Sequence, residues 1–417
     1  MSATNQMKTP QSAIVVGAGI VGLSTAWHLQ QQGLSVTVID RVGPAAGASW
    51  GNAGWVTPGL VMPLAEPGAW KYALQSLTDP DAPLHVPLRF DPRLWKFLLR
   101  FAANMNARKW QQTMSALQPI TRIVDESFAQ LKADGIASPV VAAPYVAGFS
   151  SAGAAAAFRT ELEHLHAMGQ SIGVSTLADG NRPAVLSDAV VHGLEISGQS
   201  YLDPGDFVWD LARAFKACGG RIIDGTNVSS IDAGPSSAAV TTDDGSLLTA
   251  DVVVLATGAW LPKLANKWGM KIVVQAGRGY SFTVDGDCLP KGPLYFPEQR
   301  VVCTPYQGAL RIAGTMEFLD PDEPLDSSRL ESVAKAIRPL LQGIDWSSRR
   351  DAWVGSRPIT PDGLPIVGRL ASSRIFAAGG HGMWGMVLGP ATGRLLAEHI
   401  VTGAMPQQMA AFNPLRK

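Results

Sequence analysis

Residues 13–22 read Ala-Ile-Val-Val-Gly-Ala-Gly-Ile-Val-Gly, and this stretch decides the fold. Its four leading apolar residues predict a short buried strand, of the kind found in parallel sheets that are covered on both faces. The three glycines then give way to a helical stretch over residues 23–32. Strand, glycine-rich turn and helix in this order predict the start of a dinucleotide-binding unit.

Each glycine of this turn has its own physical role. Gly17 allows the tight turn, Gly19 lets the backbone approach a pyrophosphate, and Gly22 lets the helix pack closely on the strand. Ile20 and Val21 lie in this turn just before the helix, whose free N–H groups and positive dipole end favour phosphate. We therefore expect these five residues to contact the cofactor.

A second strand, Ser35–Ile39, leads directly to Asp40. A carboxylate at the end of the second strand accepts hydrogen bonds from ribose hydroxyls, so Asp40 is expected to bind the sugar. Arg41 is adjacent and is counted with the cofactor-facing residues. An arginine here can bind the 2′-phosphate of NADP, but with Asp40 at the sugar position a solvated surface arginine is the simpler interpretation. NAD and FAD share this pattern, so it does not choose between them.

Composition narrows the class of protein. The 417 residues exceed one compact core, which favours two domains. Hydrophobic residues make up 46% and the 34 basic and 34 acidic residues cancel, so we expect no nucleic-acid partner. Cys218, Cys288 and Cys303 form no paired motif, which argues against a disulfide framework or metal site and for a reducing compartment. No apolar run reaches about 20 residues, so we expect a cytoplasmic protein.

Nucleotide-type segments recur at the start, middle and end of the chain, with other material between them. The simplest architecture is α/β, with a discontinuous Rossmann-type domain and a second domain inserted twice. We assign residues 1–60, 195–268 and 353–417 to the nucleotide domain. Residues 61–194 and 269–352 form the second domain, which is expected to bind substrate.

Four blocks of sequence identify a family resemblance. They are Gly17–Asp40, Ser49–Trp55 with Pro58, Ala256–Trp260, and Arg357–Gly363 followed by Gly379–Gly385. In this order they resemble the D-amino acid oxidase superfamily of FAD-dependent oxidoreductases, especially its D-amino acid dehydrogenase branch. The resemblance implies a Rossmann-type FAD-binding domain and a mixed-sheet α+β substrate domain above the isoalloxazine ring. It also implies non-covalent FAD, because the cysteine that attaches flavin in sarcosine-oxidase-like relatives has no counterpart after Cys303.

The resemblance also assigns cofactor contacts. They are Gly47, Ser49, Asn52, Ala53 and Gly54 for the flavin and pyrophosphate, Val228 near the adenine, Thr257 and Gly258 beside the dinucleotide, and Gly379, Gly380, His381, Gly382 and Met383 at the pyrimidine edge. Backbone N–H groups suit that edge, because reduced flavin carries negative charge there. Similar glycine oxidases place an arginine near Met383, and this chain departs from them.

Arg357 is the expected substrate anchor, because in the family this arginine grips the substrate carboxylate. A guanidinium suits the role, since its planar fork donates two charge-assisted hydrogen bonds. The alternative is a structural arginine paired with Asp351 or Asp362. Tyr280 is a candidate to close the pocket, although such a residue is more often an ordinary strand tyrosine, and His381 is placed beside the flavin with a catalytic role.

The resemblance implies hydride transfer from the α-carbon of a D-amino acid to flavin N5, which yields a 2-oxo acid and ammonia. The alternatives are oxidation of a secondary amine (D-proline, hydroxyproline, sarcosine) or glycine, and a non-catalytic flavin-bearing electron-relay subunit. The expected partners are a small amino acid and an electron acceptor, which is a quinone, a carrier protein or oxygen. Residues 95–110 read as a basic amphipathic helix. Such a helix packs on the protein's own core or, as the alternative, contacts the inner face of the cell membrane.

Overall fold

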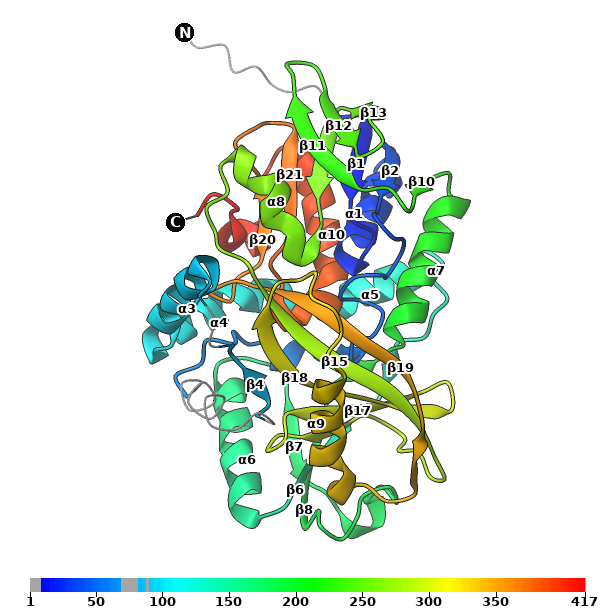
Figure 1. The fold of residues 1–417 in the computed structure, drawn as a ribbon, viewed down its shortest axis with the longest axis vertical. Coiled ribbons are helices and arrows are strands. Elements are labelled where there is room, and N and C mark those ends of the chain that lie inside the picture. Colours follow the sequence, from blue (N-terminus) through cyan, green and yellow to red (C-terminus); the bar gives the residue numbers. More distant parts are fainter. Residues whose placement is uncertain (1–8, 69–81, 88–89, 417) are drawn as a thin grey trace.

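The computed structural model describes residues 9–68, 82–87 and 90–416. Its upper part in Figure 1 is built on a six-stranded sheet with the order β10-β2-β1-β14-β21-β20. The strands are β1 (Ser12–Val16), β2 (Ser35–Ile39), β10 (Arg221–Ile223), β14 (Val252–Leu255), β20 (Ile366–Arg369) and β21 (Ile375–Gly379). Neighbours pair in parallel, except that β20 runs antiparallel to β21. The glycine-rich turn follows β1 near the middle of this sheet.

Helices and a small sheet cover the two faces of the six-stranded sheet. On one face α1 (Ile20–Gln31) packs against α10 (Gly385–Thr402), α7 (Pro204–Ala217) and their neighbours in one apolar core. On the other face the antiparallel sheet of β11 (Val228–Ala233), β12 (Ala238–Thr242) and β13 (Leu247–Ala250) packs in a second core. The expected antiparallel pair in residues 228–249 is therefore a three-stranded sheet.

The lower part in Figure 1 is a larger mixed sheet with the order β19-β15-β18-β17-β16-β6-β8-β7, with β4 paired to β18. Its strands are β4 (Leu84–His85), β6 (Tyr145–Phe149), β7 (Gly173–Thr176), β8 (His192–Ser197), β15 (Gln275–Gly286), β16 (Leu294–Phe296), β17 (Val301–Tyr306), β18 (Ala309–Leu319) and β19 (Ile344–Ile359). Helices α6 (Ala152–Ala167) and α9 (Ser327–Ile337) pack on it. A small sheet pairs β9 (Ser200–Tyr201) with β3 (Trp55–Val56) and β5 (Val141–Ala142). The α/β class and the second, mixed sheet are confirmed.

Residues 95–110 differ from the expectation in one respect. Residues 95–110 form no single helix, because α3 (Pro92–Asn104) ends and α4 (Ala107–Thr121) begins within them. Asp91 and Asn106 explain both starts, since each side chain accepts backbone N–H groups of the helix that follows it. The expected continuous amphipathic helix is wrong, and the exposed apolar positions discussed below are Leu99 on α3 and Phe90 just before it.

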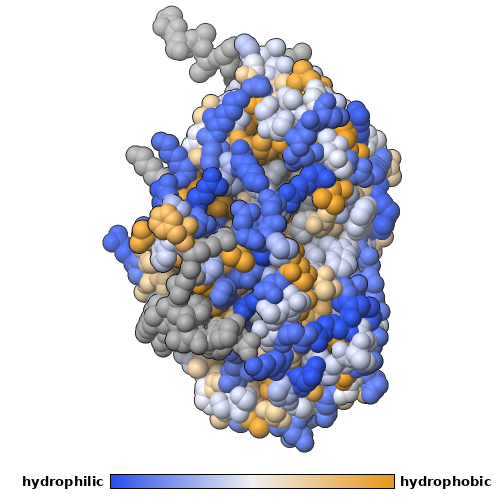
Figure 2. Space-filling model, in the orientation of Figure 1, coloured by the Kyte–Doolittle hydropathy of each residue, from blue (hydrophilic) through white to orange (hydrophobic). Residues whose placement is uncertain are grey.

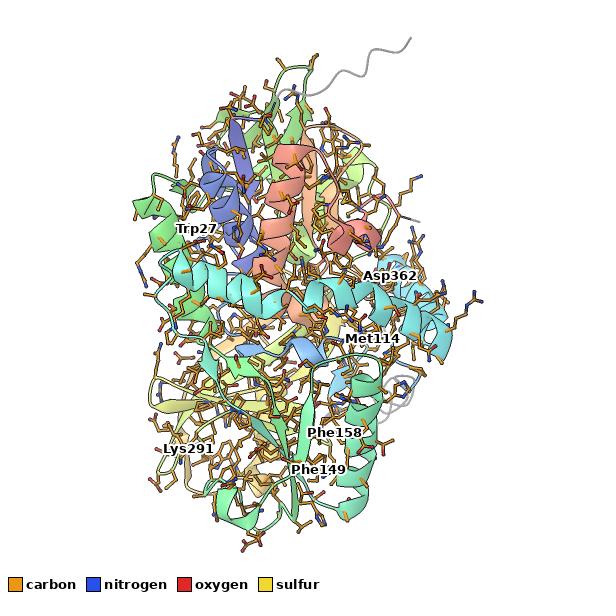
Figure 3. The ribbon with its side chains drawn as sticks, turned by 180° about the vertical axis from the view of Figure 1, so that it is seen from behind. Trp27, Met114, Phe149, Phe158, Lys291 and Asp362 are labelled. Atoms are coloured by element: carbon orange, nitrogen blue, oxygen red, sulfur yellow. The ribbon has the colours of Figure 1, made fainter. Side chains whose placement is uncertain are left out.

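Helices α4 and α5 (Val124–Ala133) cross the molecule between the two sheets, as Figure 3 shows from behind. Trp27 lies above them in that view, whereas Phe149 and Phe158 lie below. Apolar residues of both helices join the core that contains α1 and α10. The two sheets are thus bridged by chain from residues 61–194, and the division into domains by residue number stays a prediction.

Candidate cofactor and substrate site

A cavity of about 490 Å³ lies where β1, β2, β14 and β21 end, a size typical of ligand sites. Three distant parts of the chain line it. They include Gly17, Gly19, Ile20, Val21, Asp40, Arg41, Gly47, Ser49, Asn52, Val228, Thr257, Gly258, Arg357, Gly379, His381, Gly382 and Met383. The structure therefore gathers most of the expected cofactor residues, together with the expected substrate anchor, around one space.

The glycine turn has the geometry that its sequence predicts. Gly17 has φ 112°, and a Cβ there would overlap the carbonyl of Ala256, so another residue would be strained and crowded. Gly19 precedes α1 as its N-cap and has no side chain to cover the first turn. The first N–H groups of a helix have no intrahelical partner, so α1 presents donors to the cavity. Ser49 accepts one of them, from Ile20 N at 3.2 Å.

Asp40 shapes this turn as well as facing the cavity. Its carboxylate accepts N–H groups from Ala18 at 2.8 Å, Val42 at 2.9 Å and Gly43 at 3.0 Å. A carboxylate offers about four acceptor positions, so one is left for a ribose hydroxyl. The sequence indicated the sugar contact but not these three structural bonds.

The hydroxyl of Thr257 provides a test of whether a polar group fits here. It lines the cavity and is buried, and it has no hydrogen-bond partner among the described residues. Buried hydroxyls are normally paired, so this one favours a bound molecule with polar atoms. Within the same described ranges, no cluster of three His, Cys, Asp or Glu side chains could hold a metal ion.

Arg41 belongs to an ion-paired group at the cavity. Its Nη1 lies 3.1 Å from Asp322 Oδ1, and its guanidinium lies 3.9 Å from the centre of the Trp260 ring. Trp260 and Lys263 also bind Asp322, at 2.8 and 3.0 Å. Partial burial raises the pKa of Asp322, but hydrogen bonds from Lys263, Arg41 and Trp260 outweigh it, and the net pKa is lowered. Arg41 is therefore an exposed surface residue, with 43% of its side chain accessible, that is also ion-paired to Asp322 at the cavity.

Asp322 comes from the loop after β18, in the half of the molecule built on the mixed sheet. Arg278 fixes this loop, because its Nη2 donates to the carbonyls of Glu323 at 2.8 Å and Pro324 at 2.7 Å. Ser356 donates to the carbonyl of Pro321 at 3.1 Å and itself lines the cavity. The loop is thus held so that the carboxylate of Asp322 meets Arg41 and Lys263, which belong to the half built on the six-stranded sheet.

The turn from Gly379 to Gly385 joins β21 to α10 at the same cavity. His381 is 4% exposed, and its Nε2 lies 2.9 Å from Thr392 Oγ1. Burial lowers the pKa of His381 to about 4, so its imidazole is neutral near pH 7. A second hollow of about 20 Å³ adjoins the cavity and includes Gly380, which does not line the main space.

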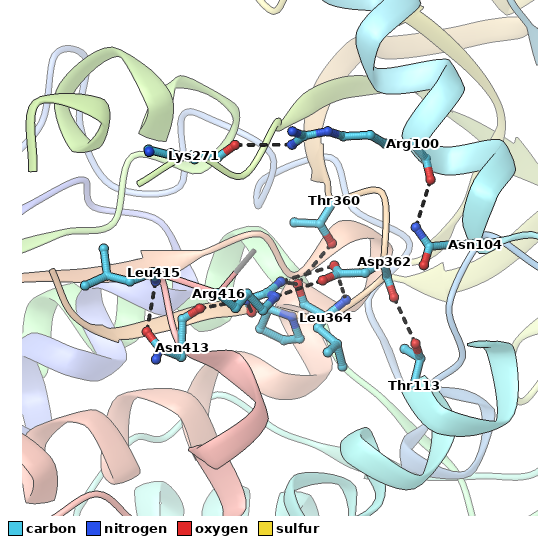
Figure 4. A network of polar contacts seen from close by, with 11 residues as sticks. Arg100, Asn104, Thr113, Lys271, Thr360, Asp362, Leu364, Asn413, Leu415 and Arg416 are labelled. Atoms are coloured by element: carbon cyan, nitrogen blue, oxygen red, sulfur yellow. Dashed lines mark hydrogen bonds and ion pairs between the residues drawn. The ribbon is translucent and has the colours of Figure 1, made fainter. Parts of the chain in front are cut away.

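Arg357 reaches the cavity from β19, and it has no carboxylate partner in the described part of the chain. Its Nη1 donates to the carbonyl of Thr315 at 3.4 Å, and neither Asp351 nor Asp362 pairs with it among the described residues. Asp362 is bound instead by Arg416 at 2.8 and 3.1 Å, as Figure 4 shows. Burial lowers the pKa of Arg357 to about 10, which leaves it cationic at neutral pH. Its remaining N–H donors are available to a ligand.

Tyr280 lies away from this cavity. It is 1% exposed, and its hydroxyl donates to Glu317, which also accepts Arg278 Nη1 at 3.0 Å. Burial first, and then the bond to Glu317, raises the pKa of Tyr280. Its place in this buried polar group argues against the expected role in closing the pocket.

Three other expected contacts also do not line the cavity. Gly22 packs on the carbonyl of Gly17, while Ala53 and Gly54 directly follow the lining residue Asn52, whose Oδ1 accepts Gly54 N. Several lining residues had no place in the sequence prediction. They are Thr226, Asn227, Ser229, Lys263, Leu264, Ser356 and Pro358. Most of them directly neighbour predicted residues in the sequence, and this adjacency is the only sequence feature that indicates them.

Comparisons with known proteins agree with this geometry. The D-amino acid dehydrogenase of Methylobacterium radiotolerans is 30% identical over 414 residues, covering 94% of this chain and 96% of that protein. The enzyme of the same name from Vibrio vulnificus (strain YJ016) is 29% identical over 425 residues, covering 97% and 99%.

Solved structures share the fold. Glycine oxidase from Geobacillus kaustophilus superimposes with a TM-score of 0.72 at 22% identity, covering 98% of this chain and 99% of that one. L-Proline dehydrogenase from P. horikoshii gives a TM-score of 0.68 at 16% identity, covering 98% of each chain. The sequence model of the FAD dependent oxidoreductase (DAO) family matches residues 12–399. The chain therefore belongs to the DAO family of FAD-dependent oxidoreductases and is an FAD-dependent enzyme.

Proposed function

We propose that this enzyme oxidises the α-carbon–nitrogen bond of small D-amino acids, with FAD held non-covalently in the cavity. The observation that carries the proposal is Arg357, a cation without a carboxylate partner among the described residues, which shares one cavity with the Gly379–Gly385 turn. A cation left unpaired in a buried site is costly unless a ligand anion completes it. The names of the similar dehydrogenases support the D-configuration of the substrate.

The chain's own residues bind and orient the substrate. Arg357 holds the substrate carboxylate by charge-assisted hydrogen bonds, which fixes the direction of the α-C–H bond. Apolar Met383, Met386 and Pro358 line the cavity and limit water. Bound FAD supplies the hydride acceptor. The oxidised product is an imino acid, which water converts to a 2-oxo acid and ammonia.

No side-chain base takes part in this proposal. Asp40 is the only carboxylate among the described residues that line the cavity, and backbone N–H groups already occupy it. His381 is neutral, and its Nε2 is engaged with Thr392. The substrate therefore enters with its amine neutral, having lost its proton to solvent. This suits primary and secondary amines alike, which keeps D-proline and sarcosine as alternative substrates.

An anaerobic reduction experiment tests the proposal. The purified yellow protein is mixed without oxygen with D-alanine, D-phenylalanine, D-proline, sarcosine, glycine and the matching L-amino acids. We expect D-amino acids to bleach the visible flavin band fastest. Faster bleaching by sarcosine or D-proline would assign a secondary-amine substrate instead. A flavin band that no amino acid bleaches would exclude catalysis and favour an electron-relay subunit.

We propose a quinone or carrier protein as the electron acceptor, in line with the dehydrogenase names of the similar proteins. Comparing oxygen consumption with reduction of a soluble quinone separates this from an oxidase. Reduction of the quinone alone supports the proposal. Rapid oxygen consumption at equal substrate turnover would contradict it.

We also propose that α3 touches the membrane from the cytoplasmic side. Phe90 is 94% exposed and Leu99 73% exposed, and Lys96 lies on the same exposed part of the chain. Elsewhere the face in Figure 2 shows hydrophobic side chains scattered among hydrophilic ones. No helix in the described part of the chain has the length and apolar character needed to cross a bilayer. Exposed apolar residues beside a cation suit contact with an anionic lipid surface.

Sedimentation with vesicles of phosphatidylglycerol and phosphatidylcholine tests this contact. Leu99→Glu should reduce the bound fraction. The matched control is Leu247→Glu, since Leu247 is 65% exposed on β13, outside α3. Equal binding by both variants and the unaltered protein would contradict the proposed contact.

A further inference from the structure

The guanidinium of Arg357 lies against two neighbouring strands, β15 and β18. We call this position the seat, and it consists of Gly279 and the carbonyl of Thr315. Arg357, on β19, is directly opposite Gly277 on β15. Side chains two residues apart on a strand share a face, so Gly279 lies on the same face as Arg357. Beyond β15, strand β18 supplies the carbonyl of Thr315 that accepts Arg357 Nη1.

Gly279 is the part of the seat that the guanidinium covers. A Cβ at this position would overlap Nη1, Cζ and Nη2 of Arg357, the three terminal atoms of the guanidinium. Gly279 is not among the glycines with positive φ, so other residues could adopt its backbone conformation. The reason for glycine here is therefore the close approach of the guanidinium, not the shape of the chain.

A β-bulge forms the edge of the seat. Pairing runs from Arg278–Glu317 to Tyr280–Gly314, so Thr315 and Met316 together face Gly279. Thr315 has φ 54°, a left-handed conformation that is unfavourable for a β-branched residue. Bulges of this kind occur beside active sites, where they redirect neighbouring groups. Here the bulge turns the carbonyl of Thr315 toward Arg357.

A buried ion pair holds the bulge in place on the opposite face of the sheet. Arg278 and Glu317 are the cross-strand pair on one side of it, with side chains only 1% and 3% exposed, and Tyr280, on the other side, also donates to Glu317. Removing one partner of such a pair is strongly destabilising, so the register at the bulge is well determined. The strained backbone at Thr315 is thereby maintained.

We propose that Gly279 is a positioning residue for substrate recognition, which acts by letting the Arg357 guanidinium lie flat on β15 against the carbonyl of Thr315. This inference rests on the proposed role of Arg357 as carboxylate anchor. The seat sets the depth and direction of the guanidinium, and hence where the substrate α-carbon lies. Displacing it moves the acid group of the substrate without touching the cofactor loop.

Gly279→Ala tests the seat directly. The added methyl overlaps the end of a flexible side chain, so the fold accommodates it by moving Arg357. We expect KM for the best D-amino acid to rise on the order of tenfold to a hundredfold. The rise in KM should exceed the change in kcat, with FAD content and Tm unchanged. Gly286→Ala is the matched control on the same strand, because its Cβ would meet Ile344 Cδ1 at 2.9 Å.

A double-mutant cycle separates positioning from general disturbance of the sheet. In an Arg357→Ala background, Gly279→Ala should raise KM no further, because the guanidinium that it displaces is gone. Additive effects would overturn the proposal. So would a Gly279→Ala protein that behaves like Gly286→Ala while Arg357→Ala raises KM. If Arg357→Ala itself leaves KM unchanged, the anchor role fails instead, which distinguishes the two failures.

Thr315→Gly provides a second test that does not depend on the folding of the alanine variant. Glycine adopts φ 54° without strain, so the bulge and its carbonyl persist. We expect KM within about twofold of the unaltered enzyme and an equal or higher Tm. A large rise in KM would show that the threonine side chain acts directly, and would overturn the backbone role.

Discussion

The cofactor end and the substrate end of the cavity use different chemistry. At the cofactor end, the turn at Gly17 and Gly19 and the start of α1 present backbone groups that are close in sequence. At the substrate end, one side chain, Arg357, is placed by the pairing of three strands far apart in the chain. Local sequence therefore determines the first region, whereas long-range sheet register determines the second.

Gly19→Val should have the largest effect and act only at the cofactor end. Gly19 has φ −77° and ψ 179°, which any residue adopts, and a Cβ would meet Ser49 Oγ at an ordinary 3.4 Å. The fold should persist while the branched side chain blocks the pyrophosphate. We expect FAD affinity to fall on the order of 1,000-fold, about 4 kcal/mol.

Flavin fluorescence titration of the apoprotein measures this change. Gly153→Val, at an open position of α6, is the control and should retain FAD. A Gly19→Val protein that purifies yellow would place the pyrophosphate elsewhere.

Arg357→Ala should have the next largest effect, confined to the substrate end. Losing a bidentate charge-assisted contact costs about 3 kcal/mol, so kcat/KM should fall on the order of a hundredfold. FAD content should not change, because no backbone donor of the cofactor loop is touched. Steady-state kinetics with Arg350→Ala as control check this, since Arg350 lies on the same strand and pairs with Asp285. Unchanged kinetics would move the anchor role to another residue.

The same contrast explains what the sequence could predict. The strand–turn–helix at residues 13–32 depends on neighbours in sequence, and its strand and turn form as expected, with Gly17 and Gly19 lining the cavity and Gly22 packed on Gly17. Arg357 was identified by its motif, but its seat was not, because a bulge opposite Gly279 leaves no local signal. Tyr280 was expected at the pocket, yet it shares a strand face with Arg278 and points to Glu317.

Asp322 forms an ion pair that local sequence also does not predict. The carboxylate meets Arg41 across 281 residues of sequence. A charge on a loop is ordinarily solvated, and nothing near residue 322 indicates the cations that it meets. Only the folded chain, in which the loop after β18 meets Arg41 and Lys263 at the cavity, brings them together.

His381 lines the cavity, and its lowered pKa predicts that the stability of the protein depends on pH. Its pKa is about 4 in the folded protein and 6.5 when unfolded, so the unfolded state binds more protons between these values. Stability should therefore fall as pH drops from about 6.5 toward 4, and stay level above this window. The contribution approaches about 1.4 kcal/mol per pH unit.

Urea unfolding of the FAD-bound protein from pH 4.5 to 7.5 measures that slope. His381→Asn should reduce it but not abolish it, because burial also lowers the pKa of His28 to about 4. An unchanged slope in the variant would show that His381 is protonated in the folded state.

Asp322→Asn should have the smallest effect, and it tests whether the substrate half helps retain the cofactor. The change leaves Arg41 and Lys263 beside the cavity without their shared anion. Partly exposed ion pairs contribute about 0.2–1 kcal/mol each, so FAD release should accelerate about two- to fivefold. Stopped-flow mixing with an excess of a tightly FAD-binding apoprotein, which traps the released cofactor, measures release.

Salt separates this electrostatic effect from a change in loop shape. At about 1 M NaCl the Debye length is near 3 Å, so release from the unaltered protein should approach that from the variant. Asp285→Asn is the control, because it breaks a similar exposed pair with Arg350 outside the cavity. If the difference in release persists at high salt, the carboxylate acts by holding the loop, and the two ends of the cavity are coupled by packing instead of charge.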